Sequence, residues 1–129
     1  MKKFLLFTVL TIASFFAYSA TPTTQASNLN IVGRGSTYLT ASWTRGNGQF
    51  VIIVVKPTAN ATSLPVSGYT GGYASSTTYG SGSNLGNSNY VVYDGTGTSV
   101  TVFGLNPNTS YTFYAYEYNM VFNSTIQDD

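Results

Sequence analysis

Residues 104–113 constrain the fold of this chain more than any other stretch, and they read Gly-Leu-Asn-Pro-Asn-Thr-Ser-Tyr-Thr-Phe. Leu105 is a single apolar residue ahead of an Asn-Pro-Asn turn, and Tyr111 opens a segment in which apolar and polar residues alternate. A tyrosine in this position packs its ring into a core while its hydroxyl bonds the turn backbone upstream, an arrangement known as a tyrosine corner. The stretch therefore predicts a β-sandwich with Leu105, Tyr111 and Phe113 in its core.

Two further segments show the alternation that is typical of half-buried strands. Apolar residues alternate with polar ones at residues 29–31 and again at residues 39–43, where Trp43 is the large apolar side chain. We expect Trp43 to lie in the same core as Tyr111. No helical period follows residue 20, so the predicted fold class is all-β.

A long segment rich in glycine, serine and tyrosine interrupts the strand pattern at residues 57–89. Directly before it, residues 50–55 are continuously apolar, so both faces of that strand must be covered. A connection of this length is either functional or partly ordered. We expect it to be a flap over the second face of the apolar strand.

The segment after this insert has the pattern of a β-hairpin. Residues 90–93 are an apolar run, residues 99–102 alternate serine or threonine with valine, and the Asp-Gly pair between them is typical of a tight two-residue turn. A long crossover, a hairpin and then a tyrosine corner indicate a sandwich with Greek-key order.

The N-terminus has the pattern of a secretory signal peptide. Lys2 and Lys3 precede an apolar run at residues 4–16, and Ala17 and Ser19 provide the small residues of a cleavage site. A transmembrane anchor is the alternative, but roughly 13 apolar residues fall short of the ~20 that a spanning helix needs. We expect residues 1–19 to be removed, residues 20–27 to be an extended lead-in, and the mature protein to be secreted without a membrane span.

Composition excludes several kinds of chemistry. The chain has no histidine and no cysteine, which rules out the usual nucleophile–histidine pairs and zinc ligand sets. Without the leader, three basic residues face four acidic ones, so no basic patch favours nucleic acid. The carboxylates show no pairing suited to glycoside hydrolysis, and Asp94 fits a turn better than a calcium loop. We expect a protein that is not an enzyme and has no cofactor or metal.

One ordered set of segments resembles a known family. It comprises residues 22–28 (Pro-Thr-Thr-Gln-Ala-Ser-Asn), 42–48 (Ser-Trp-Thr-Arg-Gly-Asn-Gly), 79–83 (Tyr-Gly-Ser-Gly-Ser), 89–93 (Asn-Tyr-Val-Val-Tyr) and 114–119 (Tyr-Ala-Tyr-Glu-Tyr-Asn). Together they resemble the fibronectin type III-like domains of secreted Bacteroidetes surface proteins, which are related to immunoglobulin-like sandwiches. The resemblance implies a domain at residues 28–129 that serves as a non-catalytic extracellular module for adhesion, spacing or protein–protein interaction. It also leaves open that the chain is a fragment of a larger multidomain secreted protein.

The end of the chain departs from the family pattern, which has a glycine- and serine-rich turn and a final strand. Here Asn119 runs directly into residues 120–126, Met-Val-Phe-Asn-Ser-Thr-Ile. Two interpretations stay open: a short, atypical last strand at residues 121–126, or a second sheet that is incomplete. In the second case the strand at residues 112–118 has a free edge, defended only by Glu117, and we expect self-association or pairing with a partner's strand.

Tyrosines provide the candidate ligand contacts. Tyr114, Tyr116 and Tyr118 share one side of a strand, and Tyr73 and Tyr79 lie in the insert. An exposed row of such rings would suit a carbohydrate-binding module that stacks on polysaccharide. The alternative is that these rings pack against the insert, an ordinary role for tyrosine on a half-buried sheet.

Overall fold

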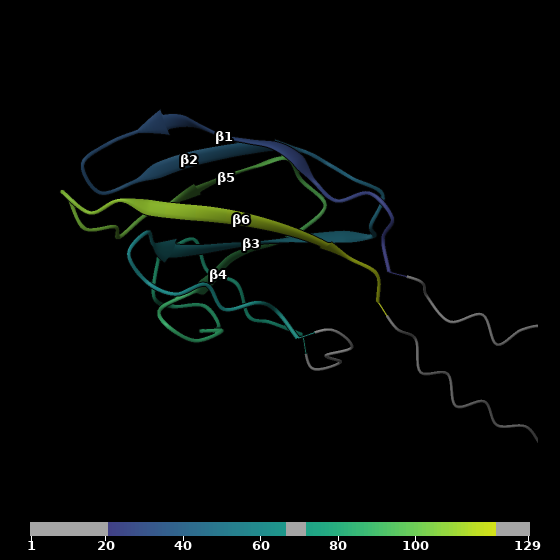
Figure 1. The fold of residues 1–129 in the computed structure, drawn as a ribbon. Helices are drawn as coiled ribbons and strands as arrows, with labels where there is room; N and C mark the ends of the chain where they lie inside the picture. Colours follow the sequence, from purple (N-terminus) through teal and green to yellow (C-terminus); the bar gives the residue numbers. More distant parts are fainter. Residues whose placement is uncertain (1–20, 67–71, 121–129) are drawn as a thin grey trace, which may run out of the picture.

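The computed structural model describes residues 21–66 and 72–120, and these form two antiparallel three-stranded sheets packed as a β-sandwich (Figure 1). No helix is present in the described residues. The strands are β1 (Ser27–Arg34), β2 (Leu39–Thr44), β3 (Phe50–Pro57), β4 (Tyr90–Gly95), β5 (Ser99–Val102) and β6 (Tyr111–Tyr118). The expected signal peptide at residues 1–19 and the expected last strand at residues 121–126 lie outside the described residues.

The first sheet has the order β1-β2-β5 and the second has the order β4-β3-β6. Figure 1 shows the two sheets as two layers. The core between them takes side chains from every strand of the second sheet and from β2 and β5 of the first, and Leu105 closes it. Its buried members are Ala41, Trp43, Val51, Ile53, Val55, Val92, Val100, Val102, Leu105 and Phe113.

The tyrosine corner forms as the local sequence predicts. The Tyr111 hydroxyl accepts a hydrogen bond from the backbone N–H of Asn106 at 3.0 Å. The ring is half-buried against the core rather than fully enclosed. Asn108 has a φ of 63°, a conformation that asparagine tolerates better than most residues. Tyr111, the first residue of β6, therefore fixes the turn through a hydrogen bond to a residue five positions upstream.

The hairpin prediction is wrong. β4 pairs with β3 in the second sheet, whereas β5 pairs with β2 in the first. Asp94 and Gly95, the expected turn residues, instead continue the β4 ladder opposite Ile52 and Val51. The apolar strand β3 provides a longer partner than β5 could, so tertiary pairing overrides the local turn signal.

The crossing from one sheet to the other occurs in the short segment between β4 and β5. The Tyr93 hydroxyl accepts a hydrogen bond from the backbone N–H of Gly97 at 2.6 Å, and the backbone N–H of Trp43 donates to the Thr98 carbonyl at 2.9 Å. The long insert was expected to make such a crossover, but it joins β3 to β4, which are neighbours in the same sheet. It follows β3 and ends at β4, close to the predicted bounds of residues 57–89.

Both faces of β3 are buried, as its continuous apolar run requires. Val51, Ile53 and Val55 point into the main core, while Ile52 and Val54 belong to a second apolar cluster on the outer face of the sheet. The insert lies on that outer face, beneath the second sheet in Figure 1. The predicted cover is therefore present in the structure.

Candidate functional site

Three tyrosines of β6 lie on the outer face of the second sheet. The antiparallel register places Tyr114, Tyr116 and Tyr118 opposite Val54, Ile52 and Phe50 without a register shift. The rings of Tyr114 and Tyr116 are stacked, with centroids 6.3 Å apart and an interplanar angle of 21°. The structure thus brings together the row that the alternation predicts.

Tyr118 uses its hydroxyl within the sheet. It donates a hydrogen bond to the Asp94 carboxylate at 2.7 Å, and its ring packs on Phe50 with centroids 5.6 Å apart. Burial raises the pKa of Tyr118, and the adjacent carboxylate raises it further, because both disfavour the phenolate. Its polar end is therefore already engaged by the protein.

The insert covers part of this tyrosine row. Tyr73 and Leu85 of the insert pack with Tyr116 and Tyr118 against Ile52, Val54 and Val91. The Tyr73 hydroxyl accepts a hydrogen bond from the Val66 N–H at 2.9 Å. Tyr73, Tyr116 and Tyr118 thus have a packing role, whereas Tyr114 carries a hydroxyl that reaches only the exposed Thr62 hydroxyl, at 3.3 Å.

Tyr79 lies apart from the other candidate tyrosines. It packs against the main core, where its ring makes edge-on contacts with Tyr90 and Tyr111 at 5.0 and 5.3 Å. Its hydroxyl donates to the Ser88 carbonyl at 2.7 Å, and burial raises its pKa to about 12. The structure therefore does not bring Tyr79 to the row formed by Tyr114, Tyr116 and Tyr118.

A buried asparagine, which the sequence analysis did not single out, holds the two ends of the insert together. Asn89 is fully buried, and its amide donates to the carbonyls of Ala61, Gly86 and Asn87 at 2.9, 2.8 and 3.2 Å. Its side-chain oxygen accepts a hydrogen bond from the Ser63 N–H at 3.1 Å. A single polar side chain thus organises the loop on the outer face.

The second sheet has two edges, and the insert covers the edge formed by β4. The Val91 N–H donates to the Ser83 carbonyl at 2.9 Å, and the Val91 carbonyl accepts from the Ser76 N–H at 3.3 Å. These bonds satisfy backbone groups that an edge strand would otherwise expose to pairing.

The opposite edge, formed by β6, is covered only at its end. The Gln25 side chain accepts a hydrogen bond from the Glu117 N–H at 2.7 Å and donates to the Glu117 carbonyl at 3.3 Å. Because hydrogen-bonding directions alternate along an antiparallel strand, Phe113 and Ala115 also direct their backbone groups away from β3. Within residues 21–66 and 72–120, no hydrogen bond satisfies those groups.

Glu117 does not defend this edge, contrary to expectation. Its side chain is buried and forms an ion pair with Arg45. It also accepts hydrogen bonds from the Gly46 and Gly48 N–H groups at 2.7 and 2.9 Å. The hydrogen bond from Arg45 is the main reason that the pKa of Glu117 lies below its ordinary value. The alternation of β6 places the Glu117 side chain on the inner face of the sheet. Only the fold shows that residues of the β2–β3 turn bind its carboxylate.

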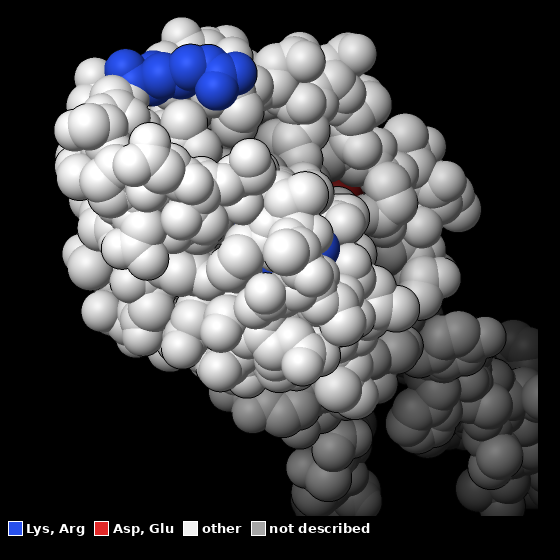
Figure 2. Space-filling view, turned by 60° about the vertical axis from the view of Figure 1, so that its left-hand side comes forward, with Lys and Arg blue, Asp and Glu red and all other residues white. Residues whose placement is uncertain are grey.

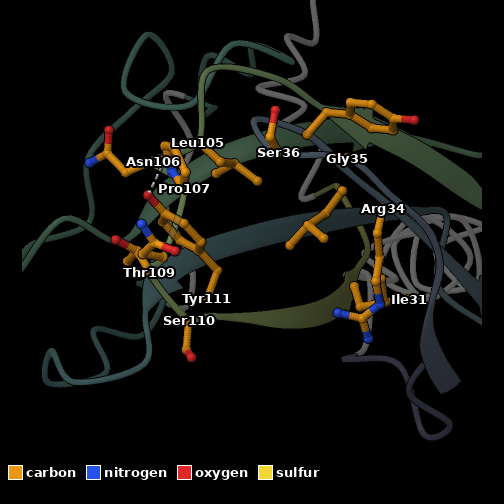
Figure 3. A pocket seen from close by; sticks show the side chains of 13 residues that line it. Ile31, Arg34, Gly35, Ser36, Leu105, Asn106, Pro107, Thr109, Ser110 and Tyr111 are labelled. Carbon is orange, nitrogen blue, oxygen red and sulfur yellow. Dashed lines mark hydrogen bonds between the residues drawn. The ribbon is translucent and has the colours of Figure 1, made fainter.

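An open cleft of about 480 Å³ lies beside the first residues of β6. Figure 3 shows Asn106, Pro107 and Tyr111 of the corner on one side of it, with Ile31 and Arg34 of β1 on the other. The cleft therefore opens between the outer strand of one sheet and the outer strand of the other. Sequence reasoning missed it, because its two walls come from opposite ends of the chain.

Charged side chains are sparse on the described surface. Most of the face in Figure 2 is uncharged, with one large blue group of basic atoms near its upper edge and small, partly covered areas of blue and red elsewhere. Lys56 is buried and donates to the carbonyls of Thr58 and Asn60 at 3.1 and 2.6 Å. In the described parts of the chain, no cluster of three or more acidic, histidine or cysteine side chains could hold a metal ion, and no helix is long and apolar enough to cross a membrane.

Comparison with known proteins gives no match: no protein-family model fits the chain, and no curated protein is similar to it. The resemblance to fibronectin type III-like domains accordingly stays a prediction. What the structure itself defines is the class, an all-β protein built as a two-sheet sandwich.

Proposed function

We propose that this protein is a secreted, non-catalytic module for adhesion, spacing or protein–protein interaction at the bacterial surface. The observation that carries the proposal is the asymmetry of the second sheet: the insert covers the β4 edge, whereas the outward backbone groups of Phe113 and Ala115 on the β6 edge have no partner among the described residues. An open strand edge is a surface to which another polypeptide can add.

The strand order supports a fibronectin type III-like identity. Strands β1, β2 and β5 share one sheet and β4, β3 and β6 share the other. This division is expected if they correspond to strands A, B and E and to strands C′, C and F of such a sandwich. The tyrosine corner at Tyr111 points the same way.

The test is a surface experiment with the full chain in a bacterial host. We expect export, removal of the leader after Ser19 or Ala20, protease-accessible protein on the cells, and greater adherence to protein-coated surfaces. The matched control is a chain that lacks residues 2–19. Retention inside the cell contradicts the proposal, and display without any gain in adherence contradicts the adhesion role and leaves spacing.

A second candidate function, carbohydrate binding, has the stacked pair Tyr114 and Tyr116 in its favour. Both rings are half-buried, and neighbouring Tyr116 has a packing role, so Tyr114 is the side chain on which this function depends. If polysaccharide stacks there, Tyr114→Ala abolishes binding on a glycan array without lowering the melting temperature. Tyr38→Ala, which truncates a tyrosine that is 38% exposed in the connection between β1 and β2, is the matched control. A blank array for the folded wild-type protein rejects this candidate.

A further inference from the structure

The side of the sandwich between β1 and β6 carries three features that no contact among residues 21–66 and 72–120 occupies. They are the unsatisfied edge of β6, the cleft beside it, and the side chain of Arg34. Each feature alone is common on protein surfaces, but here the cleft adjoins the Tyr111 end of β6 and Arg34 is one of its lining residues. Their combination specifies the chemistry of an occupant.

The edge specifies an extended backbone. Gln25 supplies one donor and one acceptor to Glu117 and thereby imitates a strand partner at that position. The next two equivalent positions, Ala115 and Phe113, have the same outward backbone direction without such a partner in the described part of the chain. A polypeptide in β conformation satisfies both residues at once.

The cleft specifies the side chains. Phe113 and Ala115 face the core, so residues directly opposite them on an added strand also face inward. The cleft begins at Tyr111, which has the same facing as Phe113 and Ala115, so the residue of the added strand opposite Tyr111 reaches the apolar groups of Ile31, Leu39 and Leu105 that line it. Alternate residues of the added strand must therefore be apolar, with polar ones on the outer face.

Arg34 indicates the charge of the added strand and the end of the strand that carries it. Arg34 lines the cleft and is exposed, and its side chain forms no hydrogen bond or ion pair with any described residue. The cleft lies at the Tyr111 end of β6, which is where an antiparallel added strand has its C-terminal end. A carboxylate near that end of the strand meets the guanidinium.

We propose that this side of the sandwich is an acceptor groove for one extended strand of another polypeptide, which pairs antiparallel with β6 at Phe113 and Ala115. The strand carries apolar residues at alternate positions and a carboxylate toward its C-terminal end. The inference rests on the proposed role in protein–protein interaction and names the site and the partner's chemistry.

A folded second copy fits the groove less well than a free strand. Its own Phe113 and Ala115 side chains already point into its own core. Edge-to-edge pairing of two β6 strands would therefore satisfy backbone groups but leave the cleft unfilled. A free strand satisfies the edge and fills the cleft together.

The experiment uses the purified chain without its leader and a synthetic peptide in which threonine and valine alternate and aspartate is C-terminal. We expect the amides of Phe113 and Ala115 to exchange quickly in the free protein and to become protected when the peptide binds. Backbone N-methylation of the peptide at the valines facing β6 should abolish binding to the unaltered protein. A C-terminal amide with asparagine in place of aspartate, or Arg34→Gln, should weaken it about two- to fivefold.

The matched protein variants are Ala115→Pro and Ala115→Ser. The Ala115 N–H does not donate to β3, so proline removes the outward donor without breaking the β3–β6 ladder. We expect proline to weaken peptide binding by at least about tenfold and serine to leave it unchanged. The N-methylated peptide keeps the test decisive if the proline variant does not fold.

Three results overturn the proposal: no peptide binding, protected Phe113 and Ala115 amides in the free monomer, or a dimer in light scattering that Ala115→Pro abolishes. The second result means that the chain closes its own edge, and the third that the occupant is a second copy. Surface adherence without peptide binding contradicts the acceptor groove but not the proposed function. Peptide binding without surface display contradicts the proposed function but not the acceptor groove.

Discussion

Arg45 and Glu117 form a two-point ion pair that joins the β2–β3 turn to the end of β6. The Arg45 Nε donates to Oε2 at 2.8 Å, and Nη2 donates to Oε1 at 3.0 Å. The same Nη2 also donates to the Gly48 carbonyl at 2.8 Å. The Glu117 carboxylate is fully buried, whereas the Arg45 guanidinium is partly exposed to solvent.

Glu117→Gln should therefore lower the free energy of unfolding at neutral pH, by about 1–3 kcal/mol, because hydrogen bonds to a charged group are lost. The pKa of Glu117 is lowered in the folded state, chiefly by the hydrogen bond from Arg45. The stabilisation by the carboxylate is thus complete above its ordinary pKa of about 4.5 and is lost as the pH falls through the lower, folded-state pKa.

Urea unfolding over a series of pH values measures this effect. The difference between wild type and Glu117→Gln should shrink toward zero in acid. Arg34→Gln, which removes an exposed charge, should change stability by less than about 0.5 kcal/mol. A difference that stays constant from neutral to strongly acid solution would show that the ion pair is not the cause.

Trp43 is the largest side chain of the core and has an exposed fraction of 4%. Trp43→Ala should cost about 3–5 kcal/mol, because the cavity cannot fully collapse. The indole N–H has no hydrogen-bond partner in the described structure, so Trp43→Phe leaves no partner stranded and should cost less than about 2 kcal/mol. Thermal and urea unfolding compare the two, and equal losses would argue against packing as the dominant contribution.

Tyr111→Phe tests the corner. It removes the acceptor of the Asn106 N–H, and the expected loss is about 0.5–1.5 kcal/mol, near the lower end because Asn106 is exposed and water can replace the bond. Tyr114→Phe removes a longer, exposed contact with Thr62 and is the matched control, with a change near zero. If both variants unfold like wild type in urea, the corner hydrogen bond contributes nothing measurable.

Alkaline stability should depend on Tyr79. Burial raises its folded-state pKa to about 12 from an ordinary value of 10, so the folded protein holds this proton more tightly than the unfolded chain does. The resulting stabilisation is complete below about pH 10 and is lost as the pH rises toward 12. Tyr79→Phe should flatten the decline in melting temperature over this range. The ultraviolet absorbance of tyrosinate should show one late-titrating tyrosine fewer in the variant.

Local patterns account for most of the individual strands. The alternation before Trp43, the apolar run of β3 and the corner at Tyr111 each depend on residues close together in the chain. A strand's period and a turn's chemistry are short-range properties, so they can be read from neighbouring residues. The length of the insert and its position over the outer face followed from the same reasoning, because a strand that is apolar on both faces needs a cover.

Pairing and burial, by contrast, were decided by the tertiary structure. The Asp-Gly pair at residues 94–95 has the local chemistry of a turn, yet it extends β4 because β3 offers ladder partners. Glu117 resembles an exposed edge charge until the fold places Arg45, 72 positions away, against it. Tyr79 and Tyr116 were both candidate ligand contacts, yet they pack against different apolar clusters. In each case the deciding contact is distant along the chain, and only the packing of one sheet on the other determines which distant groups meet.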